Sequence, residues 1–112
     1  MSRAALEIVE RQLDAYNRQD LDAYVACYAQ DVVVGGLNGA VSETSREGLK
    51  ARYAKTFADF PGNRAHLVNR IQVGNYIIDH EDVTRGPGLD RFEVIAIYTV
   101  KDGLIARVDF VK

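Results

Sequence analysis

Apolar residues in the first part of the chain recur every three to four positions, a spacing that predicts helices. The first helix is predicted over residues 2–17, with Ser2 as its N-cap. A second helix begins after Asp20, whose carboxylate can accept hydrogen bonds from the free amides of the first turn. This helix runs to Tyr28 and presents Tyr24 and Tyr28 on its apolar side. Two phenols on an apolar face are unusual in a plain core, because each buried hydroxyl needs a hydrogen-bond partner. The stretch therefore predicts the wall of a pocket.

A strand and a third helix follow this tyrosine-rich segment. The β-branched run Val32–Val34 predicts a strand, which two glycines end before a glycine-rich loop. Thr44 and Glu47 have the spacing of a capping box, so the third helix is expected to begin there. It carries Tyr53 on an inward face and ends at Pro61, where the helix cannot continue.

From residue 65 onward the apolar pattern has a period of two, which predicts strands. Together with the preceding helices, this pattern predicts an α+β fold in which three helices cover one face of a mostly antiparallel sheet. The sequence shows no repeat, linker or low-complexity segment, so residues 1–112 are predicted to form a single domain. The expected strands span residues 65–73, 76–84, 92–99 and 104–111.

Composition excludes several classes of function. The net charge is −2 with acids and bases interleaved, which lacks the basic stripe of a nucleic-acid-binding protein. A single cysteine excludes an internal disulfide, and neither histidine has metal-ligand spacing with nearby acids, so no metal is predicted. No apolar run reaches the roughly 18 residues of a membrane span, and a cytoplasmic protein without membrane partners is predicted.

Three segments carry a resemblance to a known family: RQLDAYNRQDLDAYVACYAQDVVV, REGLKARYAKTF and FEVIAIYTVKDGLIARVDF. Across nearly the whole chain, the sequence resembles the NTF2-like superfamily, in its SnoaL-like and ketosteroid-isomerase-like branch. The resemblance implies a cone, in which helices and the concave face of a strongly curved sheet enclose a pocket, and commonly a homodimer. Family members include isomerases, epoxide hydrolases, polyketide cyclases, dehydratases and non-catalytic binding subunits, so the fold does not define the function.

The resemblance permits a test of individual positions. Where ketosteroid isomerases carry an oxyanion-hole tyrosine, a general-base aspartate and a proton-donating aspartate, this chain has Gln12, Gly36 and Ala96. Without these groups it is not a true ketosteroid isomerase. Limonene-epoxide hydrolases use an Asp-Arg-Asp set on the sheet, but the stretch IIDHEDV supplies no arginine, and Asp109 is expected to face away from the pocket.

His80 is the candidate catalytic residue. The expected strand register places it on the concave side with Tyr76 and Ile78, where a neutral imidazole could act as a general base or recognise a polar ligand. The alternative is an inert, partly solvated histidine near the strand end. Asp79 and Glu81 would face inward instead if the register shifted by one residue, because strand faces alternate with period two.

The remaining candidates would line the pocket. Gln12 lies on the buried side of the first helix, as either a pocket-facing amide or an edge residue whose amide extends into water. The tyrosines could form a pocket lining or a hydrogen-bonded core. The predicted ligand-binding residues are Gln12, Tyr16, Tyr24, Tyr28, Tyr53, Phe57, His80, Ala96 and Tyr98.

Two functions remain open from sequence. The first is a cofactor-independent acid–base enzyme, an isomerase, cyclase or hydrolase, that acts on a small apolar or aromatic molecule through His80. The second is a non-catalytic ligand-binding or association module, which the apparent lack of an acid inside the cone favours. A homodimer is predicted through the outer sheet face, because aliphatic residues lie on a face that no helix covers. These residues are Ile95, Ile97, Thr99, Ile105, Arg107, Asp109 and Val111.

Overall fold

Three helices and six strands make up the computed structural model, which describes residues 3–112. The predicted Ser2 cap lies outside the described residues. Within them, no helix is both long enough and apolar enough to cross a bilayer. The elements are α1 (Arg3–Arg18), α2 (Leu21–Val25), β1 (Tyr28–Gly36), β2 (Val41–Glu43), α3 (Arg46–Asp59), β3 (Arg64–Val73), β4 (Tyr76–Thr84), β5 (Arg91–Lys101) and β6 (Leu104–Val111).

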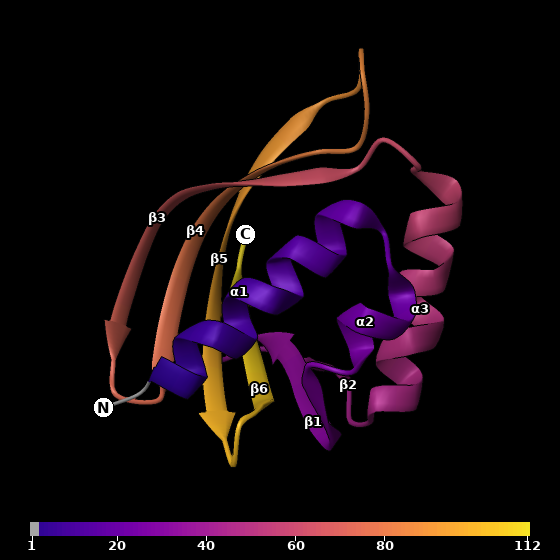
Figure 1. Cartoon of the computed structure of the whole chain (residues 1–112). Helices are drawn as coiled ribbons and strands as arrows, with labels where there is room; N and C mark the ends of the chain where they lie inside the picture. The colour runs from indigo at the N-terminus through magenta and orange to yellow at the C-terminus, as the bar shows by residue number, and fades with distance from the viewer. Residues whose placement is uncertain (1–2) are drawn as a thin grey trace.

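The strands form one sheet in the order β2-β1-β6-β5-β4-β3. All neighbouring strands run antiparallel except β1 and β6, which are parallel. The sheet curves around α1, and α2 and α3 lie at the open side of this curve without closing it (Figure 1). The predicted α+β class and the helices on the concave face are therefore confirmed.

The second helix is shorter than the sequence indicated. Asp20 caps it as predicted, because its carboxylate accepts from the Ala23 amide at 3.2 Å. The helix ends at Val25, however, and Tyr28 begins β1 rather than lying on the helix. The physical reason is long-range pairing, since the Cys27 carbonyl accepts from the Ile105 amide of β6 at 2.9 Å.

The third helix also begins differently. Ser45, not Thr44, is the N-cap, with its hydroxyl accepting from the Gly48 amide at 3.0 Å. One residue earlier, the chain is still leaving β2, a short strand that replaces part of the expected loop and pairs with β1.

Two bulges change which residues face the core. In β3, the register shifts between Leu67 and Asn69, which places Arg70 opposite Asp79 of β4. In the β5–β6 pair, the register shifts next to Thr99. Ile105, expected on the outer face, is 0% exposed in the core. A bulge adds one residue to one strand, so simple alternation fails beyond it.

The rest of the expected outer face of β5 carries half-buried side chains, including Ile95 and Ile97. The inner face of the same strand holds Val94, Ala96 and Tyr98, all buried, as the alternation predicted. The homodimer through the outer face stays a prediction.

The capping geometry gives a matched pair of variants. Ser45→Ala is expected to lower the free energy of unfolding by about 1 kcal/mol, because it leaves the Gly48 amide without its side-chain acceptor. Thr44→Ala, one position outside the helix, is expected to change it by less than about 0.5 kcal/mol. Urea denaturation of both variants measures the difference, and a larger loss in Thr44→Ala would contradict the assignment of the cap.

Candidate functional site

The orientation of β4 decides which acids face the concave side of the sheet. Ile77, Asp79, Glu81 and Val83 are all buried, so they form the inner face of this strand. His80 lies on the opposite face, where its side chain is 38% exposed and its Nε2 contacts Glu93 Oε1 at 2.6 Å. The predicted inward orientation of His80 is therefore wrong, and the register shifted by one residue is the one that forms.

Asp79 is held by an arginine from the neighbouring strand. Arg70 donates from Nε and Nη2 to the two carboxylate oxygens of Asp79, at 2.6 and 2.9 Å. Asp79 is 0% exposed, and a buried carboxylate is stable only when it is paired and hydrogen-bonded. The epoxide-hydrolase comparison found no arginine within IIDHEDV; the structure supplies Arg70 from β3, because the bulge in that strand turns it inward.

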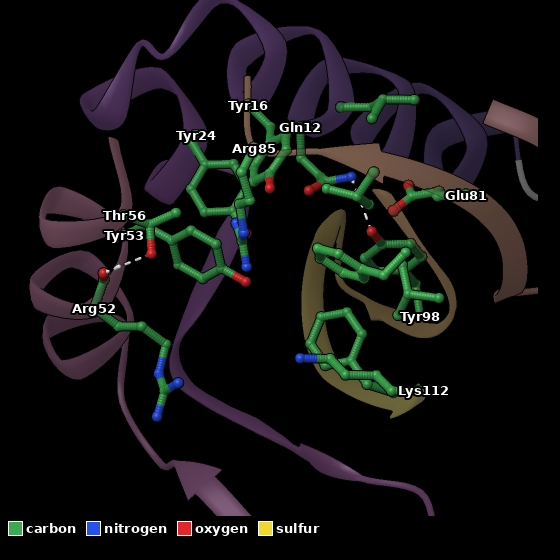
Figure 2. Close-up of a pocket in the computed structure, with 15 residues that line it drawn as sticks. Gln12, Tyr16, Tyr24, Arg52, Tyr53, Thr56, Glu81, Arg85, Tyr98 and Lys112 are labelled. Carbon is green, nitrogen blue, oxygen red and sulfur yellow. Dashed lines mark hydrogen bonds between the residues drawn. The ribbon is translucent and has the colours of Figure 1, made fainter. Parts of the chain in front are cut away.

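A cavity of about 130 Å³ lies between the helices and the inner face of the sheet (Figure 2). Its wall combines aromatic and aliphatic side chains with a few polar groups, as is typical of small-molecule sites. The lining residues are Gln12, Leu13, Tyr16, Tyr24, Arg52, Tyr53, Thr56, Glu81, Val83, Arg85, Phe92, Val94, Tyr98, Phe110 and Lys112.

Glu81 is the only acid in this lining. Its side chain is 6% exposed, and within the described part of the chain its Oε2 atom has no hydrogen-bond partner. The pKa of Glu81 is raised to about 7, mainly by burial and also by the nearby charge of Asp79, while Arg70 opposes both effects. A carboxyl group with a pKa near neutrality and an unbonded oxygen can both take and return a proton.

Gln12 connects the cavity wall to the core. Its amide nitrogen donates to the Val9 carbonyl at 3.3 Å and to the Tyr98 hydroxyl at 3.1 Å, and its amide oxygen accepts from Tyr28 at 3.0 Å. A carbonyl can only accept, so Val9 defines which end of the amide is the nitrogen. Tyr98 is thus an acceptor in this bond and keeps its own proton for a partner in the cavity. Of the two predicted positions of Gln12, the buried one is found.

Tyr16 has the same arrangement at the other side of the cavity. Arg85 donates to Asn63 Oδ1 at 2.9 Å, and Asn63 Nδ2 donates to the Tyr16 hydroxyl. A guanidinium can only donate, so Arg85 orients the amide and leaves the Tyr16 proton available. Within residues 3–112, the phenolic protons of Tyr16 and Tyr98 are therefore left without an acceptor, and both residues line the same cavity as Glu81.

The tyrosines of the site remain protonated at neutral pH. Burial is the main cause that raises the pKa of Tyr16, Tyr24, Tyr28 and Tyr98, and it raises the pKa of Tyr53 to about 12. These phenols can donate and accept hydrogen bonds but cannot serve as bases near pH 7. Among the groups of this cavity whose pKa departs from its usual value, Glu81 is the one that titrates near neutrality.

The structure brings most of the predicted ligand-binding residues to one place. Five of them line the cavity, while the other four do not border it. Of these four, Tyr28 donates a hydrogen bond to Gln12, and Phe57 packs against Tyr16 with ring centroids 5.7 Å apart. Ala96 pairs with Asp79 in the sheet, and His80 lies on the outer face. The five that line it are Gln12, Tyr16, Tyr24, Tyr53 and Tyr98.

Four functional candidates were missed by sequence reasoning: Glu81, Arg52, Arg85 and Lys112. Glu81 appeared only as the alternative register of β4. The cations gave no signal, because charged residues on a helix, in a loop and at a strand end normally face water. Within residues 3–112, no three His, Cys, Asp or Glu side chains converge as metal ligands would, and the expected absence of metal and cofactor stays a prediction.

Comparison with known proteins gives the family. The model of the SnoaL-like domain matches residues 9–108. The chain belongs to the SnoaL-like domain family. An uncharacterized cystatin-fold protein from Novosphingobium aromaticivorans is 34% identical, with a TM-score of 0.90 and coverage of 96% of this chain and 97% of that one. No curated protein matches the sequence.

More distant structures show the same fold in candidate polyketide cyclases. One from Sinorhizobium meliloti is 24% identical, covers 94% of both chains and has a TM-score of 0.79. Another, from Pseudomonas putida, is 20% identical over 96% of this chain and 90% of that one, with a TM-score of 0.72. The neighbours support the NTF2-like, SnoaL-like fold that the sequence resemblance implied.

The raised pKa of Glu81 makes stability depend on pH. Between about pH 4.5, the usual value for an unfolded Glu, and about pH 7, the folded protein binds a proton that the unfolded chain has lost. Stability therefore falls as pH rises through this window. Glu81→Gln, which mimics the protonated acid, is expected to match the wild type near pH 4.5 and to exceed it above pH 7 by up to about 3 kcal/mol, at about 1.36 kcal/mol per pKa unit.

Urea denaturation across this pH range measures the difference. The control is Glu7→Gln, which changes an exposed acid on α1 and should alter the free energy of unfolding by less than about 0.5 kcal/mol. A constant difference between Glu81→Gln and the wild type would show that Glu81 is not the titrating group.

Proposed function

We propose that this SnoaL-like protein is an acid–base enzyme that moves a proton on a small, ring-sized carbonyl compound, with Glu81 as the proton carrier. The observation that carries the proposal is the buried Glu81 carboxyl, with an unbonded oxygen, in the wall of a cavity that also holds two available phenolic protons. A buried carboxyl without a partner destabilises the fold, so a purely structural role does not account for it. A carboxyl with a pKa near 7 is also typical of a catalytic acid or base.

Each group has a distinct role in the proposed reaction. The ionised Glu81 removes a proton from the carbon beside a carbonyl, and the C–H electron pair moves into an enolate. Tyr98 and Tyr16 donate hydrogen bonds to the developing oxyanion, which lowers the barrier because their protons are already oriented by Gln12 and Asn63. Protonated Glu81 then returns the proton to the same or another carbon. Only protons move, so the step needs no electron carrier.

Isomerisation and cyclisation share this first step. Return of the proton to a different carbon gives an isomer, whereas attack of the enolate on a second carbonyl closes a ring. Several structural neighbours are described as candidate polyketide cyclases, which supports the second course without selecting it. Both courses begin with abstraction of a proton beside a carbonyl, so that step is the one to test.

Exchange of α-protons for deuterium tests the proposal without knowledge of the natural substrate. Cyclohexanone, cyclohex-2-enone and 4-hydroxyacetophenone are incubated in D₂O, and proton NMR follows the loss of signal. We expect catalysed exchange of at least one probe, a loss of about 100-fold or more in Glu81→Gln, and about 10-fold in Tyr98→Phe because Tyr16 remains as a donor. The rate should rise with pH through about 7, as Glu81 ionises.

His80→Ala is the matched control on the same strand. Its side chain faces away from the cavity, so its exchange rate should stay within about twofold of the wild type. Wild-type exchange in Glu81→Gln would overturn the proposal. Binding of the probes without any catalysed exchange would instead support the second sequence hypothesis, a non-catalytic ligand-binding module.

A further inference from the structure

The cavity is rich in positive charge although the whole chain is acidic. Arg52, Arg85 and Lys112 all line it, and Glu81 is the only opposing acid in the lining. The net charge of the complete chain is −2, so this concentration of cations is local. Focused charge inside a concave, low-dielectric site attracts ligands of opposite sign.

The three cations differ in how many partners within the protein their charged groups already have. Arg85 lies against the rings of Phe60 and Phe92, at 5.3 and 5.0 Å from their centroids, and donates to Asn63. Its position is therefore fixed, and it serves to orient Asn63 toward Tyr16.

Arg52 and Lys112 are more available. Arg52 pairs through Nε with a single acid, Glu43, at 2.8 Å, which leaves its two terminal nitrogens for other partners. Lys112 lies over the ring of Phe110, at 5.6 Å, and forms no salt bridge with any residue of the described range. A cation with no carboxylate partner beside an apolar cavity is suited to an anionic ligand.

Both available cations lie where two hollows meet. A second hollow, which extends toward Gly36 and Ser42, shares Arg52, Tyr53, Phe110 and Lys112 with the main cavity. Figure 2 shows Arg52 reaching from α3 and Lys112 from the end of β6, on opposite sides of the space below Tyr53. The two cations and the aromatic side chains of the main cavity therefore border one shared region.

The size of the main cavity limits what enters it. At about 130 Å³, it is close to the volume of about 150 Å³ that accommodates benzene in an engineered protein cavity. Its aromatic wall suits a flat ring, because aromatic faces and edges pack favourably at short range. Tyr16, Tyr24 and Tyr53 supply that wall, with their ring centroids 4.9 to 6.0 Å apart.

We propose that the cavity binds a one-ring organic carboxylate, with its ring among these tyrosines and its carboxylate between Arg52 and Lys112. The inference names the substrate class of the proposed enzyme and rests on that function, since it places the ring of the ligand against Glu81. Arg85 remains a positioning residue. The ligand would thus be held by its charged end at the opening, while the uncharged ring lies within reach of the proton carrier.

Binding of three simple probes tests the inference separately from catalysis. Benzoate carries the ring and the charge, benzamide carries the ring alone, and acetate carries the charge alone. By isothermal titration calorimetry near pH 8, we expect benzoate to bind about tenfold or more tightly than either of the others, because one charged hydrogen bond accounts for roughly that factor. Increasing the salt concentration should weaken the binding of benzoate and leave the binding of benzamide unchanged.

Variants locate the two ends of the ligand. Lys112→Gln and Arg52→Gln should each lower the affinity for benzoate about tenfold. The affinity of each variant for benzamide should stay within about twofold of the wild-type value. Lys50→Gln is the matched control, since Lys50 lies on the same helix as Arg52 but pairs with Asp22 outside the cavity. Glu81→Gln should strengthen benzoate near pH 8, because it removes the negative charge closest to the bound ring.

The outcomes separate this inference from the proposed function. Equal affinity for benzoate and benzamide would overturn the carboxylate preference and leave the proton-transfer proposal intact. Equal affinity for benzoate and acetate, or benzoate binding that Glu81→Gln does not change, would place the anion outside the cavity and overturn the inference. Loss of probe exchange in the earlier assay tests Glu81 alone and does not depend on benzoate.

Discussion

The hydrogen bonds of Gln12 are the interaction on which the site depends. This one amide joins α1 to β1 through Tyr28 and to β5 through Tyr98, deep in the core. A buried amide must satisfy all its polar atoms, so the helix can pack on the sheet in only one position along its axis. The same bonds decide that Tyr98 offers its proton to the cavity. Packing and the chemistry of the site are therefore set by the same contact.

The electrostatics of the site depend on a difference between two acids of β4, because only one of them has an arginine partner. Arg70 forms a salt bridge with Asp79, which compensates for the burial of this carboxylate and occupies its oxygens. Glu81, two residues on, receives no hydrogen bond at Oε2 and is left to titrate near neutral pH. The two carboxyls of one strand thus have different environments, since Asp79 is paired with Arg70 and Glu81 keeps an oxygen without a partner among the described residues.

The proposed acid–base chemistry does not need the ketosteroid-isomerase residues, because Glu81 supplies a carboxyl from another position. The three positions that carry those groups hold Gln12, Gly36 and Ala96 here. Ala96 pairs with Asp79, and Glu81 pairs with Val94, on the adjoining strands β4 and β5. Ala96 on β5 has a small side chain, and the acid that lines the cavity comes from the neighbouring strand β4. The fold keeps the cavity while the carboxyl comes from another element.

The sequence by itself determined the α+β class, the four-stranded meander, the Asp20 cap and the inward tyrosines, because helical and strand periodicity are local properties of the chain. It placed Gln12 on the buried side of the first helix but left open whether its amide faces the pocket or extends into water. It did not determine the register of β4, since both faces of YIIDHEDVT carry apolar and acidic residues and alternation alone has no preferred phase.

Only the tertiary structure decided that Asp79 and Glu81 face inward and His80 outward. Burial of Asp79 requires Arg70, which lies nine residues earlier in the chain. Arg70 turns inward because β3 is bulged just before it, between Leu67 and Asn69. Likewise, Arg52 and Lys112 line the same cavity although they are far apart in sequence. Such contacts depend on pairing between distant segments, and no local pattern of residues records them.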